Sequence, residues 1–263
     1  GAGMVLAEWM ETGNAPIDLW DVDIRRMQPF QANRSYLQGR VSETLGLLYA
    51  DHFPYRQFAS ARGVRRSPIH HYLVDQGACF GEAAGWERAN WFLPEEALHA
   101  GKTAAYEYSW KRQNWFDYSA AEHLAVRQSV GLFDMSSFGK IKLVGRDAEA
   151  VLQLIAANDV AMPVGKIVYT QFLNKAGHIE ADVTITRLAD DEFLVVTPAA
   201  TIRRDLHWIT AHIPDDAHAH AIDVTVSESV LSVMGPHARQ FLQPLIPQSL
   251  ANDDFAFGTM QPI

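Results

Sequence analysis

Three histidines and two aspartates between residues 212 and 220 are of the types that could hold a metal ion. They are His212, Asp215, Asp216, His218 and His220. Zinc sites in proteins use recognisable spacings of histidine and cysteine ligands, and the spacing here matches none of the standard ones. We therefore interpret this segment as a solvated loop and predict no metal site.

The single cysteine, Cys79, is the one thiol that could act as a nucleophile or form a disulfide. One cysteine excludes an internal disulfide framework and fits a reducing compartment. It lies in the apolar run Ala78-Cys79-Phe80, where a thiol usually behaves as a small hydrophobe. We predict a buried, unreactive side chain.

Arginine occurs in three scattered pairs, which could hold an anionic ligand or be ordinary surface charge: Arg25–Arg26, Arg65–Arg66 and Arg203–Arg204. Exposed arginine is the default, so we interpret them as surface charge or ion pairs. The formal net charge is −9 without a basic stripe, which argues against a nucleic-acid partner. No apolar stretch reaches the ~18 residues that span a bilayer, and no charged leader precedes one. We expect a cytoplasmic protein without a membrane partner.

Strands and single helices alternate along the chain without strict βαβ order. Apolar residues at helical spacing predict helices near 4–12, 34–49, 120–130, 147–155, 198–212 and from 236. Alternating or β-branched runs predict strands over 140–144, 167–173, 182–187, 193–196, 222–226 and 230–234. Because strands neighbour each other through short turns, the expected fold class is α+β, with antiparallel sheets and interspersed helices.

Five motifs from residue 131 onward resemble, in order and spacing, the glycine-cleavage T-protein family of aminomethyltransferases. They are Gly131–Ser136, Ala157–Val160, Gly165–Tyr169, Leu173–Gly177 and Val233–Ala238. Each motif is weak alone, and together they are specific. The first half is similar to the central region of FAD-dependent dimethylglycine and sarcosine dehydrogenases or oxidases, through Leu19–Arg26, Arg66–Pro68, Phe80–Glu82 and Gly85–Arg88.

This resemblance implies a division of the chain near Ser67. Residues 1–16 would be the tail helix of a missing FAD domain, and 17–66 a small connecting domain. Residues 67–263 would form a T-protein-like folate-binding domain that is incomplete at its C-terminus. FAD would bind only in the missing N-terminal domain of the same polypeptide.

The resemblance also implies tetrahydrofolate as cofactor and an iminium derived from an N-methyl amine as the second ligand. In this family reduced folate takes the one-carbon unit of the iminium, which yields methylenetetrahydrofolate. A carboxylate close to both partners would stabilise the cation and accept a proton. Asp182 is the candidate catalytic residue, because it is expected to open a strand after the Gly177-His178 turn. Simple T-proteins carry two adjacent acids here, whereas Ala181-Asp182 keeps the second, as flavin-linked relatives do.

Five further residues complete the folate site that the resemblance implies. Tyr169 would place a hydroxyl in the pocket and Phe138 an apolar wall for the pterin. Leu194, Val195 and Val196 would supply backbone groups to the pterin edge. The residues alone leave an alternative, in which Tyr169 and Phe138 are ordinary core aromatics and Asp182 a solvated acid.

Two other functions stay open at this point. The chain could be a non-catalytic folate-binding or regulatory module of the same fold, or an inactive fragment. The segment Trp20–Arg26 favours the oxidoreductase. Because the folate domain is expected to end early, its pocket would lack a wall, and we expect weak or absent tetrahydrofolate binding. Selectivity among N-methyl amines would lie in the missing flavin site.

Overall fold

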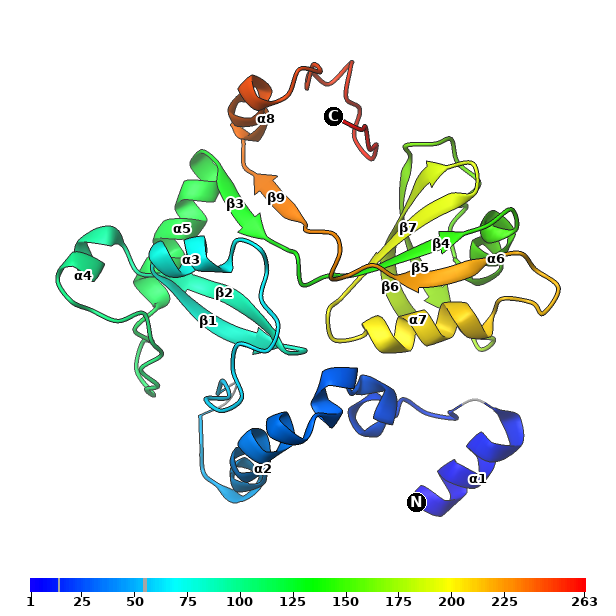
Figure 1. Cartoon of the computed structure of the whole chain (residues 1–263), viewed down its shortest axis with the longest axis horizontal. Coiled ribbons are helices and arrows are strands. Elements are labelled where there is room, and N and C mark those ends of the chain that lie inside the picture. The colour runs from blue at the N-terminus through cyan, green and yellow to red at the C-terminus, as the bar shows by residue number, and fades with distance from the viewer. Residues whose placement is uncertain (14, 54–55) are drawn as a thin grey trace.

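The computed structural model describes residues 1–13, 15–53 and 56–263, and its strands form three sheets (Figure 1). Strand β1 (Ala78–Ala83) pairs with β2 (Trp86–Phe92), and β3 (Gly131–Asp134) with β9 (Leu231–Met234). The third sheet has five strands in the order β5-β6-β7-β4-β8. Neighbouring strands in all three sheets are antiparallel, which confirms the expected α+β class.

Most of the remaining elements lie close to the predicted ones, whereas the helix at 70–75 and the strands at 78–83, 86–92 and 131–134 were not predicted. The five-stranded sheet consists of β4 (Gly139–Val144), β5 (Ile167–Leu173), β6 (Ile179–Ala189), β7 (Glu192–Thr197) and β8 (His220–Asp223). The helices are α1 (Ala2–Thr12), α2 (Arg34–Tyr49), α3 (His70–Asp75), α4 (Glu95–His99), α5 (Phe116–Gln128), α6 (Ala148–Ile155), α7 (Ile202–Ala211) and α8 (Ala238–Leu242). Helix α7 begins later than expected, because Pro198 starts a turn in which the Thr201 amide donates to its carbonyl (3.1 Å).

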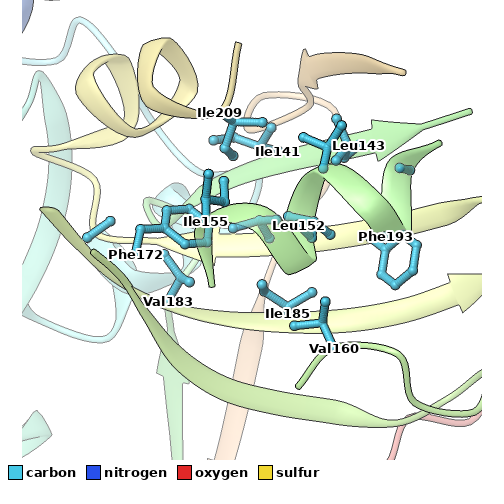
Figure 2. Close-up of a cluster of buried hydrophobic side chains, with 14 of the residues drawn as sticks. Ile141, Leu143, Leu152, Ile155, Val160, Phe172, Val183, Ile185, Phe193 and Ile209 are labelled. Carbon is cyan, nitrogen blue, oxygen red and sulfur yellow. The ribbon is translucent and has the colours of Figure 1, made fainter. Parts of the chain in front are cut away.

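The main apolar core lies between one face of the five-stranded sheet and helices α6 and α7 (Figure 2). Alternate residues of each strand point to this face, and Ile141, Phe172 and Phe193 are fully buried there. Helix α6 contributes Leu152 and Ile155 from one apolar stripe. Burial of each such large side chain stabilises the fold by roughly 1.5–3 kcal/mol, so this core fixes the register of the sheet.

A second, smaller apolar cluster lies on the β1–β2 hairpin. Its buried members are Cys79, Trp91 and Leu93, and the Trp91 ring stacks on Tyr118 with centroids 5.6 Å apart. Trp86 is also buried, beneath the Arg65 guanidinium, which lies 4.4 Å from the ring centroid. Both tryptophans are therefore buried, and residues 67–263 contain two apolar clusters. The domain boundary near Ser67 stays a prediction.

Ion pairs and ring contacts join the first 66 residues to the rest of the chain. Arg40 Nη2 lies 2.6 Å from the Glu82 carboxylate, and both side chains are nearly buried. Arg204 of α7 lies over Trp20, 4.9 Å from the ring centroid. The apolar stripe predicted on α2 is exposed instead of packed: Leu37, Val41, Leu45 and Leu48. The attachment therefore depends on charge and aromatic contacts more than on that stripe.

Among the residues that the structure describes, no helix is both long and apolar enough to cross a membrane.

Cys79 should react slowly with thiol reagents in the folded protein. Burial raises the pKa of its thiol from 9.0 to about 11, so at pH 8 only about one thiol in a thousand is ionised. Because the folded pKa exceeds the unfolded one, this neutral thiol should also stabilise the fold below pH 9 and lose that contribution between pH 9 and 11. Ellman's reagent should label the native chain slowly and the urea-unfolded chain fast. Equal rates would contradict a buried thiol.

Candidate functional site

The β5–β6 hairpin positions the predicted acid, and a tight turn holds this hairpin together. The Asn174 side-chain oxygen accepts hydrogen bonds from the amides of Ala176 and His178, each at 3.0 Å. Gly177 has φ of 80°, a left-handed conformation that favours glycine. The motif Leu173–Gly177 therefore encodes the turn itself, and the strand that carries Asp182 starts at Ile179.

Asp182 is consequently the fourth residue of β6 and does not open the strand as expected. The ladder shifts register between Phe172 and Leu173 of β5, because Ala181 pairs with Phe172 and Ile179 with Leu173. Beyond this bulge Ala181 points into the core and Asp182 points to the opposite, exposed face. The bulge thus determines that residue 182, and not residue 181, faces the exposed side of the sheet.

Asp182 meets Tyr169 and Gln171 on this open face of the sheet. Gln171 Nε2 donates to Asp182 Oδ1 at 3.1 Å, and these two residues pair directly across the ladder. A hydrogen bond to the Asp182 carboxylate raises the pKa of the Tyr169 phenol, since the neighbouring charge disfavours tyrosinate. Tyr169 is 61% exposed, so the alternative of a buried core aromatic is wrong for this residue.

A continuous row of side chains crosses the same face on four strands. The register places Tyr169 opposite Thr184, Thr184 opposite Val196, and Val196 opposite Lys140. Directly paired residues of antiparallel strands point to the same side, so these four share one surface. The row runs from the exposed edge strand β5, which carries Tyr169, the partner of Asp182, to β4 inside the sheet.

Residues 194–196 contribute differently from what was expected. Strand β7 pairs with β6 on one side and β4 on the other, so the ladders already use its backbone donors and acceptors. These groups are therefore not free to bind a pterin edge, which corrects that prediction. Val195 points into the core and is fully buried, whereas Leu194 and Val196 present half-buried side chains on the Asp182 face.

Phe138 lies beyond the start of β4, three strands from Tyr169, or roughly 14 Å at the usual strand spacing. Its position depends on Lys140, a residue that is only 1% exposed. Lys140 Nζ donates to the carbonyls of Ser136 and Phe138, at 2.9 and 2.8 Å. Burial lowers the pKa of this lysine. The ammonium therefore anchors the loop that presents Phe138.

Sequence reasoning assigned no role to Lys140, Gln171 or Thr184. Strand alternation could have found them, since Lys140 and Lys142 take the positions between the core residues Ile141 and Leu143.

Around residues 212–220, the His212 ring lies 2.8 Å from the Trp208 carbonyl. The described part of the chain contains no group of three metal-ligand side chains.

Comparison with family models matches nearly all of the chain. Residues 69–263 match the GCVT N-terminal domain, and residues 12–67 match the FAD dependent oxidoreductase central domain. In fold, the chain is similar to the aminomethyltransferase T of the glycine cleavage system from Bartonella henselae. The TM-score is 0.59 at 22% identity, over 75% of this chain and 47% of that one.

Three curated relatives align over almost the whole chain. One is a 4-methylaminobutanoate oxidase (formaldehyde-forming) from Paenarthrobacter nicotinovorans, 42% identical over 96% of this chain. The others are from Mus musculus: the mitochondrial regulatory subunit of pyruvate dehydrogenase phosphatase, 33% identical over 97%, and mitochondrial sarcosine dehydrogenase, 30% identical over 99%. The chain spans only 30%, 29% and 32% of the length of these relatives, respectively.

Replacement of the acid should change the titration of Tyr169. In Asp182→Asn the negative charge beside the phenol is gone, so the pKa of Tyr169 should fall towards its ordinary value. The difference in tyrosinate absorbance between Asp182→Asn and the unmodified chain should vanish in a Tyr169→Phe background. Asp191→Asn, at an exposed acid in the β6–β7 turn, serves as the control and should leave the titration unchanged. Identical curves for Asp182→Asn and the unmodified chain would contradict the contact.

Removal of the buried ammonium should destabilise the fold more than removal of its neighbour. Lys140→Met leaves two carbonyls without their charged donor, and we expect a loss of about 1–3 kcal/mol in the free energy of unfolding. Lys142 instead forms partly exposed ion pairs with Glu192 and Glu228, so Lys142→Met should cost less than about 1 kcal/mol. Urea unfolding of both variants measures the difference, and similar losses would show that Lys140 anchors nothing.

Proposed function

The chain belongs to the glycine cleavage T-protein family, with an FAD dependent oxidoreductase central domain ahead of its GCVT N-terminal domain, and on this premise we propose that it is a tetrahydrofolate-dependent one-carbon-transfer module. It would serve an oxidoreductase that acts on N-methyl amines. The one-carbon unit of an amine-derived iminium would pass to tetrahydrofolate, which gives methylenetetrahydrofolate and releases the demethylated amine. The resemblance in both parts of the chain to sarcosine dehydrogenase supports this assignment.

The observation that carries the proposal is the contact between Asp182 and Tyr169 on the open face of the sheet. Tetrahydrofolate, when bound, supplies the nucleophilic amine that takes up the carbon. The residues present fit such a group, because a flat heterocycle can lie against the exposed Tyr169 ring and the side chains of Leu194 and Val196. Phe138 would form a more distant wall.

In this proposal Asp182 has two tasks. Its carboxylate stabilises a neighbouring cationic carbon, and it accepts the proton that the amine releases. Gln171 and Tyr169 would hold the carboxylate in place, Gln171 by donating from Nε2 and Tyr169 through a hydroxyl whose raised pKa keeps it protonated. The acid is thus oriented by two partners on β5, the neighbouring strand.

A regulatory role without catalysis is the second candidate, because one relative is the regulatory subunit of pyruvate dehydrogenase phosphatase. That subunit is aligned over nearly the same residues, at 33% identity. In such a module the same face would bind folate or a similar ligand without transfer of carbon.

The expected cytoplasmic location also stays a prediction, and two of the relatives are mitochondrial proteins.

The test uses a polypeptide in which this chain follows a flavin domain. With sarcosine as the amine and tetrahydrofolate present, Asp182→Asn should lower methylenetetrahydrofolate formation by about 10²–10⁴-fold, the usual contribution of a general base. Anaerobic reduction of the flavin by sarcosine should stay unchanged, because Asp182 is assigned to the transfer step alone. Stopped-flow absorbance and chromatography of the folate products measure the two steps.

Asp191→Asn is the matched control and should leave both steps unchanged. Formaldehyde should also be measured, because the oxidase relative is described as formaldehyde-forming. If Asp182→Asn forms methylenetetrahydrofolate at the normal rate, the catalytic assignment fails. If the unmodified protein binds tetrahydrofolate and releases only formaldehyde, the transfer function fails and the binding module is favoured.

A further inference from the structure

A pocket of about 280 Å³ lies where the connecting segment meets the five-stranded sheet, away from Asp182. Its polar lining comes from residues far apart in the sequence: Gln28, Arg65, Arg203 and Asp223. Pro29, Phe30 and Val64 supply apolar walls. Arg65 also lines an adjoining pocket of about 290 Å³ together with Arg66. The fold therefore gathers members of two separate arginine pairs at one junction.

Arg65 and Arg203 have no carboxylate partner, unlike three other arginines near the junction. Arg25, Arg62 and Arg204 each form an ion pair, with Asp23, Glu87 and Asp205. Among the described residues, no carboxylate oxygen lies within ion-pair distance of Arg65 or Arg203. Burial lowers the pKa of Arg65, and the more distant charge of Asp223 opposes that shift.

Gln28 gives an independent sign that a ligand belongs here. The residue is only 5% exposed, and its Nε2 has no hydrogen-bond partner among the residues described. Its backbone is held by Gln31, whose amide donates to the Gln28 carbonyl (3.0 Å) and whose side-chain oxygen accepts from the Gln28 amide (2.6 Å). A buried donor without a partner is unfavourable by about 1–3 kcal/mol, and an acceptor in the pocket would remove that penalty.

The pocket also contains one acid, which limits the chemistry of the ligand. Asp223 Oδ1 accepts from the Thr225 amide at 2.9 Å, and the carboxylate attracts Arg65 from beyond contact distance. The lining of the pocket thus includes two guanidinium groups, a side-chain amide and a carboxylate. A ligand with an anionic end and a cationic or N–H end matches both kinds of group.

The walls of the pocket are held in place before any ligand enters. The Arg65 amide donates to Gly85 (3.1 Å), and the Arg65 carbonyl accepts from the Glu87 amide (2.9 Å). The Phe30 ring packs so closely on Gly85 that a side chain there would collide with it, at 2.3 Å. The arginine and the aromatic wall are therefore preorganised, which lowers the entropy that binding has to overcome.

We propose that this junction pocket binds a small amino acid zwitterion, with its carboxylate on Arg65, Arg203 and Gln28 and its amino group towards Asp223. The site is separate from the Asp182 face and does not rest on the function proposed for it. The occupancy of this pocket would follow the concentration of an amino acid substrate or product, and the pocket would take no part in one-carbon transfer.

Calorimetry of the 263-residue chain with sarcosine and with 4-aminobutanoate tests the proposal, with acetate and methylamine as single-charge probes. At least one of the two amino acids should bind, and acetate and methylamine should bind about tenfold more weakly or not at all. Arg203→Gln should weaken amino acid binding by about tenfold or more, as expected for a lost charge-assisted contact. Asp223→Asn should remove the preference over acetate.

Arg203 is exposed, so Arg203→Gln should fold normally. Arg65→Gln is the second variant, but it could disturb the contact with Trp86, and in that case the result for Arg203→Gln decides the test. Arg127→Gln, an exposed arginine of α5, is the matched control and should bind normally. Asp182→Asn should also bind normally, which separates this site from the transfer site. Absence of binding by both amino acids, equal binding of acetate, or an equal loss in Arg127→Gln would overturn the proposal.

Discussion

The two-residue alternation of the five-stranded sheet is the constraint on which the rest of this structure depends. One set of side chains must enter the core against α6 and α7, so the other set has no choice but to face outward. Tyr169, Asp182 and Val196 reach a common surface for this reason, together with the bulge that sets the direction of Asp182. A slip of one residue in β6 would bury Asp182 and expose Val183, and the energy of the core opposes it. The position of the candidate site is therefore a consequence of core packing.

Charged side chains that are partly or fully buried have two kinds of surroundings in this fold. Lys140 donates to two backbone carbonyls of the loop before β4, and Arg40 of α2 contacts the Glu82 carboxylate of β1, so Arg40 links two elements that are far apart in the sequence. Arg65 is stacked on Trp86 and has no carboxylate in contact among the described residues. Satisfied charges hold elements together, whereas an unsatisfied one is available to a ligand. This distinction separates the structural arginines from those of the junction pocket.

The sequence predicted the sheet and its helices well, because their apolar positions repeat at the periods of strands and helices. It also predicted that Tyr169 and Asp182 belong together, through the order of motifs typical of the family. It could not show the bulge opposite Phe172, which sets the direction of Asp182, because a bulge depends on how two strands pair. Residues 194–196 were expected to offer backbone groups to a ligand, and the sequence could not show that β7 is a central strand paired on both sides. The stripe on α2 predicted a packed face, and periodicity alone does not reveal what covers it.

The arginine pairs show how the structure changes an interpretation that composition alone supported. The two members of the pair Arg203–Arg204 have different surroundings. Arg204 binds Asp205 and contacts Trp20, whereas its neighbour Arg203 lines the junction pocket. The paired member attaches the connecting segment to α7, and this attachment brings Gln28 and Phe30 to the same pocket. The contact that assembles the junction thus also builds the pocket, so a ligand bound there would stabilise the attachment itself.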